Sequence, residues 1–234
     1  MHIAAKYGKE EISKFLIAAG VDINVKTIFG ETALSSAIQA GYKAMVRFLL
    51  EAGSDISLLV GGGKTLLHIA ATWRREAITR LLLEHNLDVN KVDFVQQRSA
   101  LHEAAKNGHT DLVKILLEKG EDVGLSDNAN KTAMSEAKES GNLRLVDLLN
   151  TWIAEQSNKK MLSLRREYYK TCLVAELRKF LHRREIEFKT KSNKSELIEL
   201  LIQHDTVHPD AVYLDGYRDQ SSVSSRSHDE KVIL

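Results

Sequence analysis

A glycine-rich stretch carries the residue types of a phosphate-binding loop: residues 61–65 read Gly-Gly-Gly-Lys-Thr. In such loops, main-chain N–H groups surround the phosphates of a nucleotide and the lysine contacts the terminal ones. The full pattern also requires a glycine five residues before its last glycine, and Leu58 stands at that position. The sequence therefore disfavours nucleotide chemistry here, and the stretch needs an explanation from the local structure.

Three histidines, His2, His68 and His102, occupy one position in a recurring phrase. Histidine is a common metal ligand and general base. However, the ligands of one zinc ion must lie within about 2 Å of it, whereas residues repeated on stacked helices lie about 10 Å apart. We therefore expect these histidines to bind the main chain of a neighbouring repeat. We expect no metal site, no cofactor and no enzymatic activity.

The phrase around these histidines returns along the first 150 residues at a nearly constant interval. Its anchors are separated by 33, 33, 34 and 33 residues, and they are Met1, Leu34, Leu67, Leu101 and Met134. A second segment with Leu and Ile at helical spacing follows each anchor, and stacking should bury one apolar seam. Its first members are Ile12, Met45, Ile78 and Leu112.

Glycine is expected between the two helices of each repeat, because the left-handed conformation that ends a helix favours it. Four repeats carry it, at Gly8, Gly41, Gly108 and Gly141, and the third has Arg74 instead.

A period of about 33 residues with a Thr-x-Leu-His-x-Ala phrase is typical of ankyrin repeats, and residues 1–150 resemble that family. The resemblance implies an all-α solenoid of about five helix-pair repeats joined by short hairpins. We assign this array to residues 1–156. Its first repeat is expected to be truncated, because Met1 already occupies the anchor position.

The resemblance also implies a protein-interaction scaffold, whose partner binds the concave face formed by first helices and hairpin tips. Trp73 is the strongest candidate, because tryptophan is enriched among residues that dominate binding energy. The alternative for the hairpin tips is that their apolar side chains pack against neighbouring hairpins. The candidate protein-binding residues are Tyr7, Phe29, Ile69, Thr72, Trp73, Phe94, Glu103, Lys106 and Asn107.

Composition excludes several classes of protein. The chain has 234 residues, 43% hydrophobic and 28% charged, which is typical of globular domains. It contains no run of 18 or more apolar residues, and Cys172 is its only cysteine. We therefore expect an intracellular protein of the nucleus or cytoplasm, with neither a membrane nor a small-molecule substrate among its partners. Cys172 is expected to be a core residue.

Basic residues are concentrated after the repeats, because residues 159–194 hold 12 Lys and Arg but only 4 Asp and Glu. Within residues 171–203 the pattern predicts two short helices around a basic connector, and Asn193 with Glu196 predicts a capping box for the second. Residues that carry a resemblance to the SAP DNA-binding motif are Val174, Glu176, Leu177, Arg178, Leu181, Arg184, Ile186, Lys194, Leu197, Ile198 and Leu201.

Two residues depart from the SAP pattern, since Glu185 and Ser192 stand where glycine is expected. The resemblance implies a helix-extended-helix module at residues 157–204 with DNA as a possible partner through residues 171–203. The candidate nucleic-acid-binding residues are Arg178, Lys179, Arg183, Arg184, Lys191 and Lys194.

Two functional hypotheses remain open at this point. In the first, the chain is an adaptor that holds a protein partner and contacts DNA through the SAP-like module. In the second, it is purely a protein-binding scaffold whose C-terminal helices extend the cap of the array, and the basic residues form a solvated surface or dock an acidic tail. The serine-rich residues 205–234 are predicted to be that tail and to be disordered.

Overall fold

The computed structural model describes residues 1–208, and this part of the chain is helical with no β-strand. Contacts between Cα atoms divide the chain into two compact units, unit 1 (Met1–Thr151) and unit 2 (Trp152–Leu234). The predicted all-α fold is confirmed. Most of the predicted tail lies outside the described residues.

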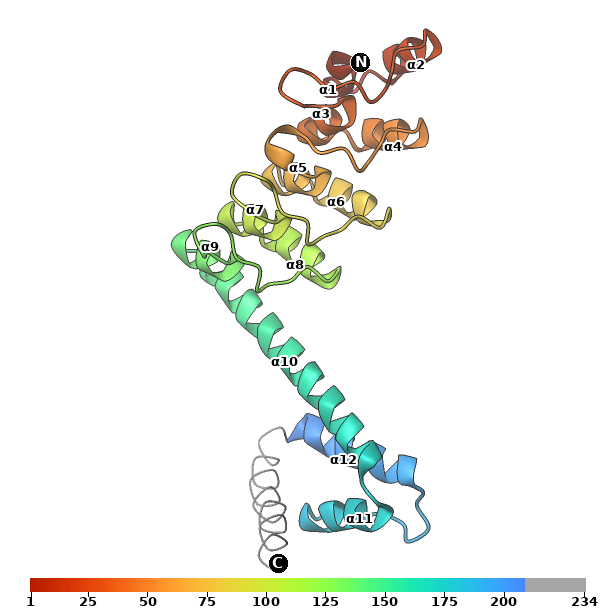
Figure 1. Ribbon diagram of the computed structural model, residues 1–234, viewed down its shortest axis with the longest axis vertical. Coiled ribbons are helices and arrows are strands. Elements are labelled where there is room, and N and C mark those ends of the chain that lie inside the picture. Colours follow the sequence, from red (N-terminus) through yellow and green to blue (C-terminus); the bar gives the residue numbers. More distant parts are fainter. Residues whose placement is uncertain (209–234) are drawn as a thin grey trace, which may run out of the picture. The chain divides into compact units, whose positions relative to one another are not determined.

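Unit 1 is a stack of helix pairs (Figure 1). The first helix of each pair packs on the first helix of the next pair, so that these helices line one side of the stack and the second helices line the other. The first helices are α1 (His2–Lys6), α3 (Ala33–Ala40), α5 (Leu66–Thr72), α7 (Ala100–Lys106) and α9 (Ala133–Glu139). The second helices are α2 (Glu10–Ala18), α4 (Lys43–Glu51), α6 (Glu76–Leu83), α8 (Thr110–Glu118) and the start of α10 (Leu143–Thr171).

A capping box begins four of the first helices. In α5 the hydroxyl of Thr65 accepts a hydrogen bond from the main-chain N–H of His68, while Nδ1 of His68 accepts one from the N–H of Thr65. These bonds satisfy N–H groups that a helix start leaves unpaired. The pairs are Thr32 with Ser35, Thr65 with His68, Ser99 with His102, and Thr132 with Ser135.

The predicted apolar seam is buried in the internal repeats, where Met45, Ile78 and Leu112 are at most 2% exposed. The prediction is wrong for the first repeat, because Ile12 is 52% exposed. In the second repeat the preceding helix pair contacts this position, since the Ser13 hydroxyl of α2 donates to Sδ of Met45 at 3.8 Å.

The turn between the two helices of a repeat requires a left-handed residue. Gly41 has φ of 88°, and Arg74 adopts φ of 51° at the corresponding position of the third repeat. A side chain with Cβ pays about 1–2 kcal/mol in this region. The fold therefore keeps the backbone geometry of glycine even where the sequence replaces it.

Hairpin tips between repeats are closed by main-chain hydrogen bonds, such as Val60 N–H to Lys64 O and Gly63 N–H to Val60 O, both at 2.9 Å. The stretch that resembles a phosphate loop is one of these tips, with a 3-10 turn over Gly61–Gly63. A Cβ added to Gly63 would lie 2.3 Å from the ring of Phe94, so the next hairpin requires glycine there. Packing between hairpins thus accounts for the glycine run.

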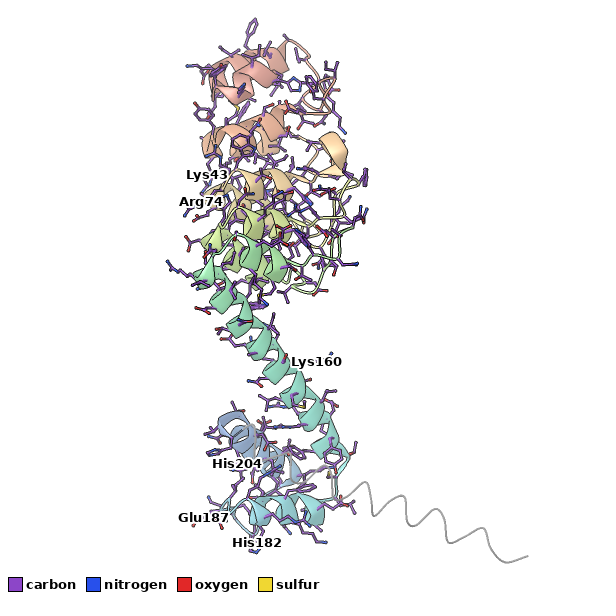
Figure 2. All side chains as sticks on the ribbon, turned by 90° about the vertical axis from the view of Figure 1, so that its left-hand side faces the viewer. Lys43, Arg74, Lys160, His182, Glu187 and His204 are labelled. Carbon is purple, nitrogen blue, oxygen red and sulfur yellow. The ribbon has the colours of Figure 1, made fainter. Side chains whose placement is uncertain are left out.

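Unit 2 contains the remainder of α10, then α11 (Val174–Arg183) and α12 (Lys194–Val207). Figure 2 shows side chains filling the space between these helices, with His182 on α11 and His204 on α12. The predicted capping box is present, since the Asn193 side chain accepts from Glu196 N–H at 3.0 Å. The core residues are Tyr169, Cys172, Leu177, Phe180, Leu181, Leu197, Ile198, Leu201 and Ile202.

The predicted start of the tail is too early. α12 continues to Val207, and Asp205 is 1% exposed rather than part of a polar tail. The carboxylate of Asp205 is held by the Tyr169 hydroxyl at 2.8 Å, which explains how an acidic residue remains buried in this helix.

Candidate interaction surfaces

The repeated histidines bridge consecutive repeats, as predicted. Because the N–H of Thr65 donates to Nδ1 of His68, the proton of the neutral ring lies on Nε2, which donates to Arg98 O at 2.7 Å. His102 donates likewise to Lys131 O at 3.0 Å. Burial lowers the pKa of His68, which favours this neutral form. These side chains therefore have a structural role.

Trp73 lies at the end of α5 and is 47% exposed. Ile69 lies four residues earlier, which places the two residues on the same side of the helix, and Ile69 and Thr72 are half-buried. Tyr7 is 58% exposed at the equivalent place after α1. Lys106 and Asn107 are exposed at the end of α7. We call this side of unit 1, formed by the first helices and the hairpin tips, the first-helix face.

The two candidate residues at hairpin tips differ in their surroundings. Phe29 is 74% exposed. Phe94 is 66% exposed, but its ring also packs on Gly63 of the preceding hairpin, and its N–H donates to Gly62 O at 2.8 Å. Phe94 thus combines the two alternatives considered for the tips, since it packs against a neighbouring hairpin and still presents a surface to solvent.

Glu103, predicted to bind a partner, is instead buried with 8% exposure. Its carboxylate lies 3.9 Å from the Lys64 ammonium and 3.9 Å from the Arg98 guanidinium. Arg98 also donates to Glu136 at 2.8 Å. The two cations compensate the charge of this buried carboxylate. All of these residues belong to the array, so the network is internal to it.

A cluster of buried polar groups in unit 2 was not predicted from the sequence. Asp205 accepts the Tyr169 hydroxyl, and its carboxylate lies 3.5 Å from Arg184 and 3.7 Å from Arg165. Arg184 also donates to the Tyr169 oxygen at 3.1 Å. This group, which we call the Asp205 cluster, joins α10, the connector after α11, and α12. Burial raises the pKa of Tyr169 to about 12, so its hydroxyl stays protonated at neutral pH.

The six candidate nucleic-acid-binding residues differ in exposure. Lys179, Arg183, Lys191 and Lys194 are exposed, and Lys194 also donates to Lys170 O at 2.6 Å. Arg178 and Arg184 are less exposed: Arg178 donates to Thr190 O at 2.8 Å, and Arg184 belongs to the Asp205 cluster. The side chain of Arg184 is 5% exposed, so little of it is accessible to DNA in this structure. Counting charges does not reveal which cations are buried.

No helix within residues 1–208 is long and apolar enough to cross a membrane. Over the same range, no three His, Cys, Asp or Glu side chains are grouped closely enough to hold a metal ion. Cys172 lies in the core of unit 2, where burial raises the pKa of its thiol.

Comparison with known proteins agrees with the repeat geometry. A family model of ankyrin repeats in three copies matches residues 1–93 and again residues 91–160. No curated protein matches the chain significantly. The match covers more than half of the chain and coincides with the stacked helix pairs of unit 1. The chain therefore belongs to the ankyrin-repeat family, and its array is a scaffold for protein–protein interaction.

Proposed function

We propose that the chain is a non-enzymatic adaptor that binds its protein partner through the first-helix face, with Trp73 as the central contact. The observation that carries this proposal is the exposure of Trp73 in an element whose other faces are packed in the array. A half-exposed tryptophan with a half-buried isoleucine one turn away offers apolar area that a partner can bury. Tyr7 after α1 and Phe29 at a hairpin tip add exposed apolar area on the first-helix face.

Site-specific photocrosslinking tests which face is used. A photoreactive amino acid replaces Tyr7 or Asn107 on the first-helix face, or Arg80 on α6 as the matched position among the second helices. We expect one defined partner to be crosslinked from positions 7 and 107 and lost when Trp73→Ala is added. Crosslinking from position 80 alone would reject the proposal.

A second candidate function, contact with duplex DNA, is favoured by the backbone at Glu185. This residue stands where the SAP pattern has glycine, and it adopts φ of 56°, the conformation that glycine favours. The two helices and basic connector of unit 2 thus keep the backbone turn of that pattern despite the substitution. Lys179, Arg183 and Lys191 are exposed cations that would contact phosphates.

Fluorescence anisotropy with a labelled duplex tests this second function on the full chain. Binding through phosphate contacts must weaken steeply as salt rises, because each contact releases a counterion. The absence of binding at low salt would leave unit 2 as an extension of a purely protein-binding scaffold.

A further inference from the structure

Ion pairs recur at one position of the repeat along the first-helix face. The residue before each capping Thr or Ser is a cation in three repeats, and each cation contacts a glutamate of a first helix. Lys64 lies 3.9 Å from Glu103, Arg98 lies 2.8 Å from Glu136, and Lys131 lies 2.6 Å from Glu139.

The pattern reverses at its first occurrence. Glu31 occupies the position of Lys64, Arg98 and Lys131, so a carboxylate replaces the cation. The two positions that carry the glutamates elsewhere hold neutral residues here: Ile69 corresponds to Glu103 and Glu136, and Gln39 corresponds to Glu139. Among the described residues the Glu31 carboxylate has no ion pair and no hydrogen bond, and the same holds for the Gln39 side-chain amide.

A pocket of about 140 Å³ lies at this place. Its apolar walls are Phe29, Val60 and Ile69, Gln39 contributes an amide, and Glu31 is its only charged lining residue. A cavity of about 150 Å³ holds a benzene molecule, so this pocket has room for one side chain. Both Ile69 and Gln39 line it, which means that the pocket opens where the partner glutamates of the other repeats are missing.

Basic residues of the same hairpin, of the next hairpin and of α1 make other contacts. Lys26 donates to Leu59 O at 2.7 Å, Lys64 faces Glu103, and the His2 ring contacts the main-chain oxygen of Glu31 at 3.0 Å rather than its carboxylate. As a whole, the Glu31 residue is half-buried.

We propose that this pocket binds one lysine or arginine side chain of the protein partner. The methylene stem packs on Phe29, Val60 and Ile69, and the charged end pairs with Glu31, replacing the cation that the other repeats supply internally. The Gln39 amide is available to the partner's main chain. This inference rests on the proposed use of the first-helix face, since Ile69 lies one helical turn from Trp73.

Methyl NMR of the full chain tests the pocket directly. The probes are α-N-acetyl-lysine amide and its neutral counterpart α-N-acetyl-norleucine amide, which has a similar stem and no ammonium. We expect the lysine probe to shift the Ile69 and Val60 methyl signals, with a Kd about tenfold lower than that of the norleucine probe. Equal effects of the two probes, or no shift by the lysine probe up to its solubility limit, would overturn the proposal.

Three variants make the test specific. Glu31→Gln should raise the Kd of the lysine probe about tenfold, whereas Glu84→Gln, which changes an exposed carboxylate outside the pocket, should leave it unchanged. The double variant Glu31→Lys with Ile69→Glu rebuilds the ion pair of the other repeats and should fold normally without binding the probe. Unaltered binding to Glu31→Gln would also overturn the proposal.

The crosslinking experiment separates this inference from the proposed function. If Trp73→Ala abolishes crosslinking from positions 7 and 107 and Glu31→Gln has no effect, the first-helix face binds the partner and the cation pocket is rejected. If crosslinks form only from position 80, the proposed function is rejected whatever the lysine probe does.

Discussion

The hydroxyl of Tyr169 donates a hydrogen bond to Oδ2 of Asp205 across 2.8 Å, and this contact connects the last turn of α10 to the last turn of α12. The Asp205 side chain is 0% exposed, and Arg184 contacts both residues. A buried carboxylate is tolerated when its charge is compensated, and here Oδ2 accepts the Tyr169 hydroxyl while Oδ1 lies 3.5 Å from the Arg184 guanidinium. The cluster therefore fixes the packing of the three helices in unit 2.

Tyr169→Phe keeps the ring and removes this hydrogen bond. We expect the free energy of unfolding of unit 2 to fall by about 1–3 kcal/mol, because the buried carboxylate loses a donor. Hydrogen exchange measured by mass spectrometry on the full chain should show faster exchange in α11 and α12. Tyr42→Phe in unit 1 is the control and should leave exchange in unit 2 unchanged; equal exchange in both variants would contradict the role of the cluster.

The buried carboxyl group of Glu121 should make the stability of unit 1 depend on pH. It is 3% exposed and accepts the N–H of Leu101 at 2.8 Å, and burial raises its pKa to about 7 from 4.5. Because the folded state binds this proton more tightly than the unfolded state, stability is lost as pH rises from 4.5 through 7. The shift corresponds to roughly 3 kcal/mol at alkaline pH.

Glu121→Gln removes this titration and keeps an acceptor for Leu101. We expect the variant to melt at a higher temperature than the parent chain at pH 8 and at about the same temperature near pH 4.5. Thermal unfolding followed by circular dichroism over this pH range measures the difference. A constant difference across the range would show that Glu121 does not titrate between these limits, whereas Glu84→Gln should show no difference at any pH.

Arg74 and Glu185 both hold a left-handed conformation, with φ of 51° and 56°. Replacing either by glycine should raise the free energy of unfolding of its unit by about 0.5–1 kcal/mol, the strain of a side chain less the entropy cost of glycine. Arg74 lies at the surface of unit 1 (Figure 2). Its ion pairs with Glu76 and Asp111 are exposed and offset little of this gain.

Urea denaturation measures the free energy of unfolding of both glycine variants, Arg74→Gly and Glu185→Gly. The matched control is Arg80→Gly in the middle of α6, which should lower the free energy of unfolding of unit 1 by about 1 kcal/mol. If Arg74→Gly destabilises unit 1 as much as Arg80→Gly does, the left-handed position carries no strain.

The period of the sequence predicted the stack of helix pairs because every repeat must bury the same face, so the same positions recur. His68 shows which contacts the repeat pattern could predict. Its recurrence argued against metal binding and predicted its contact with the next repeat. Its second role, capping its own helix with Thr65, was indicated only by the Thr-x-x-His spacing. That spacing is a capping box with histidine in the place of Glu or Gln.

Contacts between non-repeating residues were not predictable in this way. Arg75 donates to Gln39 O at 2.6 Å and Asn142 donates to Gly108 O at 3.3 Å, so residues at one repeat position reach the preceding first helix with different side chains. No residue type recurs at this repeat position to indicate the contact. Likewise, the sequence around Asp205 indicates the start of a polar tail. Its contacts with Tyr169 and Arg184 join residues far apart in the sequence, and such contacts leave no local pattern.

The exposed and the buried cations of unit 2 should differ in their effect on DNA binding. Replacing Lys179 and Lys191 together by alanine removes two exposed charges without breaking a described contact, so we expect weaker binding and a salt slope smaller by about 2. Replacing Lys114 and Lys119 in unit 1 by alanine removes the same charge and should leave the slope unchanged.

Arg184→Ala should weaken binding only as unit 2 loses its fold, because Arg184 contacts Asp205 and Tyr169. Anisotropy titrations at several salt concentrations, with hydrogen exchange of α11 and α12 on each variant, separate these effects. If Arg184→Ala reduced the salt slope while exchange stayed protected, Arg184 would be a direct phosphate contact and the assignment of its side chain to the Asp205 cluster would be wrong.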